Sequence, residues 1–154
     1  MHLYLAQHGE AVSGEVDPRR PLTAAGCDAV AKTAAFAAQR GIVRANRIMH
    51  SGKERARQTA EIMAGHLNPP EGISKEPGLA PLDDPAIWAE RLPEFAADVM
   101  LVGHLPHLSK LASWLLCQNK SIKTVDFRMG GIVCLGRDET GSWSVNWMIS
   151  PDTV

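Results

Sequence analysis

The sequence predicts an α/β fold: a three-layer sandwich in which helices flank a mainly parallel central sheet and the chain ends in a β-hairpin. Short apolar runs typical of buried strands alternate with longer segments that carry apolar residues at helical spacing, as in chains that build parallel sheets. In the last segment, apolar and polar residues alternate on both sides of a turn, which is typical of an antiparallel hairpin. The 154 residues are enough for a single domain with a sizeable core.

The N-terminal part of the chain predicts a strand followed by a helix. The apolar run His2–Ala6 predicts a buried strand that ends at a polar turn. The alanine-rich segment Thr23–Arg40 predicts a helix, which Gly26 weakens in its interior and Gly41 ends as a C-cap. A loop rich in glycine and proline joins the two.

A second strand and helix follow. Asn46–His50 predicts the strand, and Lys53–Leu67 predicts the helix, with Ser51 as a possible N-cap. Arg55 then lies in the first turn of this helix. The next segment, Asn68–Pro85, is dense in proline and glycine and predicts an ordered but irregular excursion.

The C-terminal half predicts two further helices, a strand and the hairpin. Asp84 and Pro85 predict the start of a helical stretch that Pro93 interrupts near Leu92. The remaining elements are a buried strand at Asp98–Gly103, a helix at Leu105–Cys117, and hairpin strands at Ile132–Leu135 and Trp143–Ile149.

Reactive side chains follow three of the predicted strands. His8 follows the first strand, the turn with Ser51 and Arg55 follows the second, and His104 follows the third. Ligands of parallel sheets bind beyond the carboxyl ends of the strands, so we expect these side chains to meet at one edge. The sequence therefore predicts a single functional site there.

The residue types at this edge suit phosphoryl chemistry. Histidine can act as a covalent catalyst, and Gly9 allows a close backbone approach that holds the His8 ring in one tautomer. Arg55 in the first turn of a helix adds a guanidinium to unpaired backbone N–H groups, an arrangement suited to phosphate. A protonated His104 could donate to another phosphoryl oxygen.

Five sequence blocks resemble motifs of the histidine phosphatase superfamily, which has the phosphoglycerate-mutase-like fold, and within it the SixA-type phosphohistidine phosphatases. In family order they are QHG at residues 7–9, RPLTAAG at 20–26, SGKERARQTA at 51–60, GHLP at 103–106 and NWMISP at 146–151. The resemblance runs from residue 3 to residue 151, nearly the whole chain.

The resemblance implies phosphoryl transfer from the substrate to His8, followed by hydrolysis of the phosphoenzyme. The catalytic residues would be His8, Arg55 and His104. The phosphate-binding residues would be Gln7, Gly9, Arg20, Arg55 and His104. No metal or organic cofactor is implied.

Two departures from the family pattern bear on activity. Gln7 stands where the family has arginine, and losing a charge-assisted hydrogen bond costs roughly 1.5–3 kcal/mol. No residue in Gly78–Asp84 matches the glutamate general acid of fuller family members. That absence suits a phosphohistidine substrate, because a departing imidazole with a pKa near ~6.5 needs little protonation.

Composition excludes several other classes of protein and site. A formal charge of −1 and the absence of a basic cluster argue against nucleic-acid binding. Cys27, Cys117 and Cys134 have neither disulfide nor zinc spacing, and His104 with His107 lacks partners for a metal site. No apolar run is long enough to span a membrane. We expect a cytoplasmic monomer without a membrane or nucleic-acid partner.

The leading hypothesis is a phosphohistidine phosphatase, slowed by Gln7, whose partners are a phosphohistidine-bearing protein or a small phosphorylated substrate, and inorganic phosphate. One alternative is a phosphatase for small phosphomonoesters, which the missing general acid disfavours. The other is a non-catalytic module that binds phosphate or a phosphoprotein, which Gln7 favours. Faster turnover of phosphate esters than of phosphoramidates would favour the first alternative. Tight phosphate binding with no measurable phosphoenzyme would favour the second.

Overall fold

A computed structural model describes all 154 residues and contains one sheet of six strands in the order β3-β2-β4-β1-β5-β6. The strands are β1 (His2–Gln7), β2 (Arg47–His50), β3 (Ile73–Lys75), β4 (Val99–Gly103), β5 (Ile132–Arg137) and β6 (Trp143–Ile149). The helices are α1 (Ala24–Arg40), α2 (Glu54–Leu67), α3 (Ala86–Arg91) and α4 (His107–Cys117), with a 3₁₀ turn at Leu92–Glu94. No helix is both long and apolar enough to cross a membrane.

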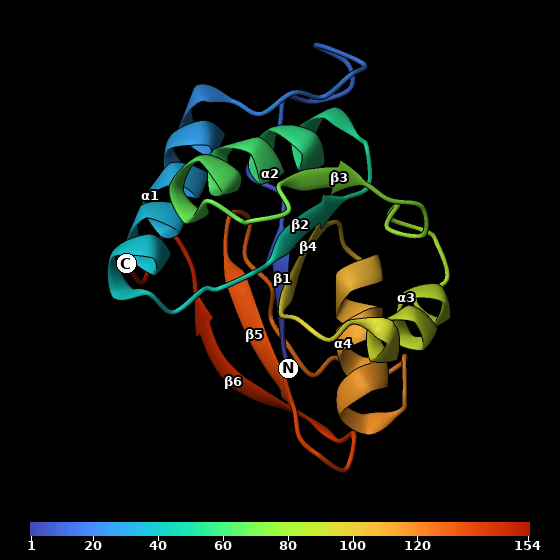
Figure 1. The fold of residues 1–154 in the computed structure, drawn as a ribbon. Coiled ribbons are helices and arrows are strands. Elements are labelled where there is room, and N and C mark those ends of the chain that lie inside the picture. The colour runs from blue at the N-terminus through green and yellow to red at the C-terminus, as the bar shows by residue number, and fades with distance from the viewer.

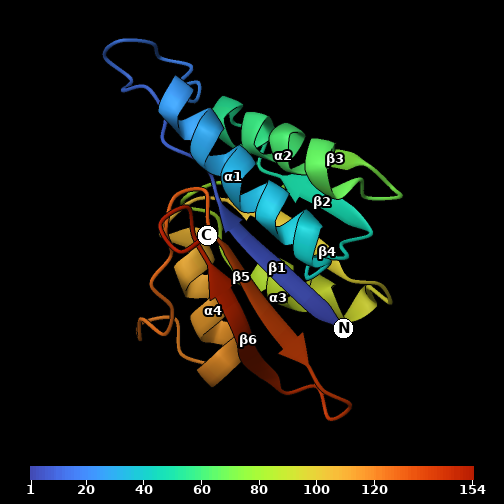
Figure 2. The same cartoon turned by 90° about the vertical axis from the view of Figure 1, so that its left-hand side faces the viewer.

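The molecule has three layers, with α1 and α2 on one face of the sheet and α3 and α4 on the other (Figures 1 and 2). Alternate residues of β1 face the two helical layers. Leu3 and Leu5 pack in the core cluster that contains α4 residues, and Tyr4 and Ala6 pack in the cluster that contains α1 and α2 residues. This arrangement confirms the predicted sandwich.

The sheet is parallel on one side and antiparallel on the other. Strands β3, β2, β4 and β1 pair in parallel, whereas β5 pairs antiparallel with β1 and β6 pairs antiparallel with β5. The last two strands form the predicted hairpin. In the parallel part, Gln7 pairs with Gly103 and His50 with Val102, so β1, β2 and β4 end at the same edge.

Three predicted helix starts differ from the structure. Ser51 is not the N-cap of α2, so that prediction is wrong: Lys53 occupies the cap position with extended backbone, and α2 begins at Glu54. Helix α4 begins two residues later than predicted, at His107, because Pro106 occupies its cap position. At α3, Pro85 occupies the cap position rather than the first helical position, and the helix begins at Ala86, whose N–H donates to Oδ1 of Asp84.

The segment predicted to be irregular, Asn68–Pro85, contains the short strand β3. It pairs in parallel with the edge of β2, opposite Ile48–His50. Three residues are too few to show an alternating pattern, so only the tertiary pairing reveals this strand. Two other predictions are confirmed: Gly41 ends α1 in the left-handed region with φ of 62°, and the helical stretch containing α3 is interrupted at Leu92.

Candidate active site

The ends of β1, β2 and β4 bring the predicted side chains together. The imidazole rings of His8 and His104 lie 5.0 Å apart between centroids. The Nε–H of Arg55 donates to Nε2 of His8 at 3.3 Å. Oγ of Ser51 lies 2.6 Å from Nε2 of His104. Four side chains from three separate strand-to-helix segments therefore form one cluster at the carboxyl edge of the sheet.

Backbone contacts fix the His8 ring in one tautomer. Nδ1 of His8 lies 2.7 Å from the carbonyl oxygen of Gly9, so Nδ1 carries the proton and donates it. The Gly9 N–H donates to Oγ1 of Thr59 at 3.0 Å. Both backbone polar groups of Gly9 are thus engaged, and Gly9 supports His8 rather than offering a free donor to phosphate. The lone pair of His8 lies on Nε2, facing the cluster.

The surroundings keep His8 unprotonated. Burial is the largest effect and lowers its pKa below the ordinary value; the hydrogen bond to Gly9 opposes this in part, and the positive charges of Arg55 and Arg20 lower the pKa further. An imidazole that stays neutral with its lone pair on Nε2 is the form that attacks an electrophile.

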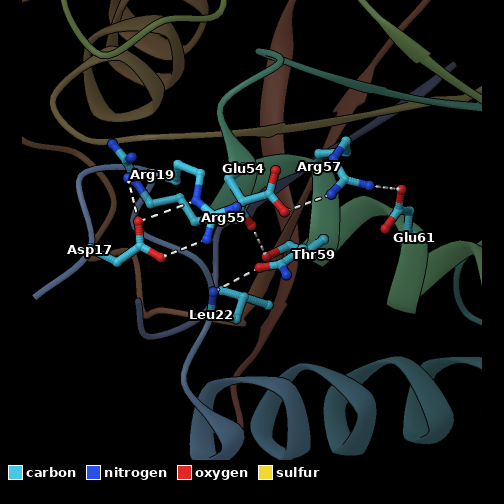
Figure 3. Close-up of polar contacts among 9 residues, drawn as sticks. Asp17, Arg19, Leu22, Glu54, Arg55, Arg57, Thr59 and Glu61 are labelled. Atoms are coloured by element: carbon cyan, nitrogen blue, oxygen red, sulfur yellow. Dashed lines mark hydrogen bonds and ion pairs between the residues drawn. The ribbon is translucent and has the colours of Figure 1, made fainter. Parts of the chain in front are cut away.

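The guanidinium of Arg55 has no carboxylate partner, in contrast to its neighbours. Arg57 pairs with Glu54 at 2.6 Å and also with Glu61, and Arg19 pairs with Asp17 at 3.0 Å (Figure 3). Burial lowers the pKa of Arg55, and the nearby charge of Arg20 lowers it further. Its charge is therefore free for an anion.

Arg20 supplies the second unneutralised guanidinium near His8. Its Nε–H donates to the carbonyl of Val12 at 3.1 Å, and it forms no ion pair. Its backbone φ of 49° lies in the left-handed region, which non-glycine residues rarely adopt. Two free guanidinium groups beside an unprotonated histidine make a site suited to a phosphoryl dianion.

His104 is neutral in the free protein. It is only 1% exposed, and burial followed by the proximity of His8 and Arg55 lowers its pKa to about 3. Its Nε2 contacts Ser51, and its Nδ1 is buried without a partner. The predicted protonated form therefore requires an anion bound beside the ring to raise this pKa.

Gln7 brings a neutral amide to the end of β1. Its Oε1 is buried without a hydrogen-bond partner, and its backbone carbonyl accepts the N–H of Gly130 at 3.0 Å. In the segment Gly78–Asp84, where the sequence offers no general acid, both acidic side chains bind other groups. Asp83 accepts the N–H of Ala80, and Asp84 pairs with Lys120.

Sequence reasoning gave no role to two residues of α2 that support the site. Oγ1 of Thr59 donates to the carbonyl of Arg55 at 2.7 Å while accepting the Gly9 N–H, so it ties two site residues together. Oε1 of Gln58 accepts the N–H of Leu22 at 2.7 Å and holds the loop after Arg20. Both lie three or four residues after Arg55, a helical spacing that was the available signal.

The geometry does not bring metal ligands together. No group of three or more His, Cys, Asp or Glu side chains could hold a metal ion. His107, next to His104 in the HxxH pattern, is fully buried with neither ring nitrogen hydrogen-bonded.

Known proteins resemble the chain along nearly its full length. No protein-family model matches it. It is 30% identical over 156 residues to the phosphohistidine phosphatase SixA of Escherichia coli strain K12, covering 98% of this chain and 94% of that protein. The structure of the protein histidine phosphatase SixA complexed with tungstate superposes with a TM-score of 0.86 at 29% identity, covering 99% and 98% of the two chains.

More distant structures share the fold. An alpha-ribazole-5'-P phosphatase from Escherichia coli has a TM-score of 0.76 at 18% identity, covering 100% of this chain and 99% of that one. A phosphoserine phosphatase mutant from Entamoeba histolytica has a TM-score of 0.74 at 14% identity, with coverage of 99% and 98%.

Proposed function

The chain belongs to the histidine phosphatase superfamily, and from this premise we propose that it hydrolyses phosphohistidine on a protein through a phosphoenzyme intermediate on His8. One observation carries the proposal. His8 presents an unprotonated Nε2, with its tautomer fixed by Gly9, beside a guanidinium that no carboxylate neutralises.

In the first step, Nε2 of His8 attacks the phosphorus while the P–N bond to the substrate imidazole breaks. The ring nitrogen of the substrate that is not bonded to phosphorus takes up a proton from solvent before the P–N bond breaks, so the imidazole leaves as a neutral ring. A leaving group with a pKa near ~6.5 needs little help from a general acid. The engagement of Asp83 and Asp84 away from His8 is consistent with this chemistry.

In the second step, water attacks the phosphorus of the phosphoenzyme, and the bond from phosphorus to Nε2 breaks. Inorganic phosphate leaves and His8 returns to its starting form. The residues around it act by positioning the phosphoryl group and neutralising its charge. We assign Arg55 and Arg20 as the charged phosphate ligands, with His104 as a donor once the anion raises its pKa and Gln7 as a neutral ligand.

An open site supports a protein substrate. The structure has four surface cavities, and none is lined by His8, Arg55 or His104. The partly buried His8 therefore lies outside these cavities. Small-molecule sites are usually concave and bury most of the ligand. A side chain presented on the surface of another protein fits a site outside such a cavity better.

The test compares the natural chain with His8→Asn on a phosphohistidine protein and on a phosphoserine peptide, in the presence of a metal chelator. We expect hydrolysis of phosphohistidine to exceed that of the ester by at least about 100-fold, and an acid-labile phosphoenzyme that His8→Asn lacks. Faster turnover of the ester would instead identify a phosphomonoester phosphatase.

A non-catalytic phosphoprotein-binding module is the second candidate, and the neutral Gln7 favours it. It predicts tight binding of phosphohistidine protein by both variants, with no phosphoenzyme and no release of phosphate. In that case Gln7→Arg should restore turnover, because a transition-state arginine contributes ~10³–10⁵-fold in phosphoryl transfer.

A further inference from the structure

We propose that Lys53 supplies the positive charge that the phosphate pocket lacks at Gln7. This inference rests on the proposed phosphate-binding function of the pocket. The family motif places an arginine at the end of β1, where this chain has an uncharged amide with a buried, unpartnered Oε1. A phosphoryl group in transfer spreads negative charge over its oxygens, so a missing cation weakens the pocket unless another residue replaces it.

Other nearby cations are not available for this role. The guanidinium of Arg19 is bound by Asp17, and its side chain is 81% exposed. Arg57 is held between two glutamates of α2 (Figure 3). Arg20 and Arg55 already serve as the two guanidinium ligands. Of the basic residues in the turn between β2 and α2 and the first turn of α2, only Lys53 is both unassigned and without a carboxylate partner.

The backbone of Lys53 is tied into the site. Its N–H donates to Oγ of Ser51 at 3.3 Å, and the same Oγ contacts Nε2 of His104. Two residues later, Arg55 reaches Nε2 of His8. Lys53 is therefore held between contacts to both histidines, at the cap of α2, where the backbone is extended before the helix begins.

The side chain of Lys53 is free to turn toward an anion. It is exposed and makes no hydrogen bond or ion pair. Its charge already contributes to lowering the pKa of the buried His104, after the effects of burial, His8 and Arg55. Lysine carries its charge on a flexible four-carbon stem and binds phosphate as a point charge, so it can serve without the fixed geometry of an arginine.

Lys75 offers a matched control. Its stem packs across Gly52, where an added Cβ would lie 2.5 Å from Lys75 Cε, so Lys75 borders the same turn. It is also exposed and without an ion pair, but its charge affects His50 rather than His104. If Lys53 acts locally, only its removal weakens phosphate binding. If net charge alone matters, removal of either lysine has the same effect.

The experiment measures two quantities for Lys53→Gln and Lys75→Gln: the affinity for inorganic phosphate, by calorimetry, and kcat/KM on a phosphohistidine protein. We expect Lys53→Gln to weaken phosphate binding about tenfold and lower kcat/KM by about 10–100-fold, and Lys75→Gln to change either less than about twofold. In a Gln7→Arg background, the loss caused by Lys53→Gln should shrink to less than about threefold, because the restored arginine makes the lysine redundant.

Equal losses in the two lysine variants, or an undiminished loss in the Gln7→Arg background, would overturn the role of Lys53. Phosphate binding needs no turnover, so it separates this inference from the proposed function. If the natural chain binds phosphate through Lys53 but leaves phosphohistidine intact, the proposed substrate fails and the role of Lys53 stands. Thermal unfolding of each variant identifies any that is misfolded.

Discussion

At the scale of single residues, function depends on which charges are left unpaired. Arg55 and Arg57 both lie in the first turn of α2 and differ little by sequence alone. The structure separates them, because Glu54 and Glu61 neutralise Arg57 (Figure 3), whereas the side chain of Arg55 makes its hydrogen bond to His8. Pairing on the surface makes Arg57 structural, and the absence of pairing makes Arg55 available to a substrate.

This contrast predicts different outcomes for the same conservative change. Arg55→Lys should lower kcat/KM on a phosphohistidine protein by about 100-fold, because an ammonium cannot reproduce the planar fork of donors. Arg57→Lys should change it less than about twofold, since exposed ion pairs contribute little. Steady-state kinetics of both variants test this. Comparable losses would mean that Arg55 acts through net charge alone.

The sequence predicted that His8, Arg55 and His104 would lie together, but not which residues support them. His8, Arg55 and His104 were found because each lies at or just after the end of a predicted strand, and parallel topology brings such ends together. Thr59 was missed because its role is a hydrogen bond to Gly9, fifty positions away in the chain. Contacts of that kind depend on how helices pack, which periodicity does not reveal.

At the scale of elements, the glycine in the interior of α1 has a packing role. The sequence suggests only that Gly26 weakens the helix. In the structure, a Cβ at this position would lie 2.2 Å from the carbonyl oxygen of Glu10. The helix therefore approaches the loop that follows His8 so closely that only glycine fits, and the loop is held where His8 needs it.

Replacing glycines in two helices should give opposite results. Gly26→Ala should destabilise the protein by about 2 kcal/mol or more and reduce activity, because backbone must move to admit the methyl group. Gly65→Ala, in α2, should stabilise it by about 0.5–1 kcal/mol, since nothing lies within 4 Å of that Cβ. Urea unfolding measures both changes. A stabilised Gly26→Ala protein would refute the close approach.

Element boundaries were predictable where a local signal acts alone. Gly41 ends α1 in the left-handed conformation, as the sequence indicates. Ser51 carries the same kind of signal at α2, yet its hydroxyl contacts His104, and Lys53 takes the cap position. The local preference of serine for a cap lost to a tertiary contact in the candidate site.

At the scale of the whole molecule, the burial of neutral histidines links folding to pH. Burial lowers the pKa of His8, His50, His104 and His107 below the ordinary value of 6.5. The unfolded chain therefore binds more protons than the folded protein as the pH falls below 6.5. Stability is fully present above that pH and decreases below it, down to a pH of about 3 in the case of His104.

His107 allows this linkage to be tested away from His8. It is fully buried, burial lowers its pKa, and Asp83, the backbone of Gly78 and Asp84 raise the pKa only partly. His107→Leu removes this buried titrating group, so it should reduce the loss of unfolding free energy between pH 7.5 and pH 5 by up to about 2 kcal/mol. His66→Gln, at an exposed position of α2, serves as the control and should leave the loss unchanged. Urea unfolding at the two pH values measures both variants, and an equal loss in the natural chain and in His107→Leu would mean that His107 does not contribute to the acid sensitivity of the fold.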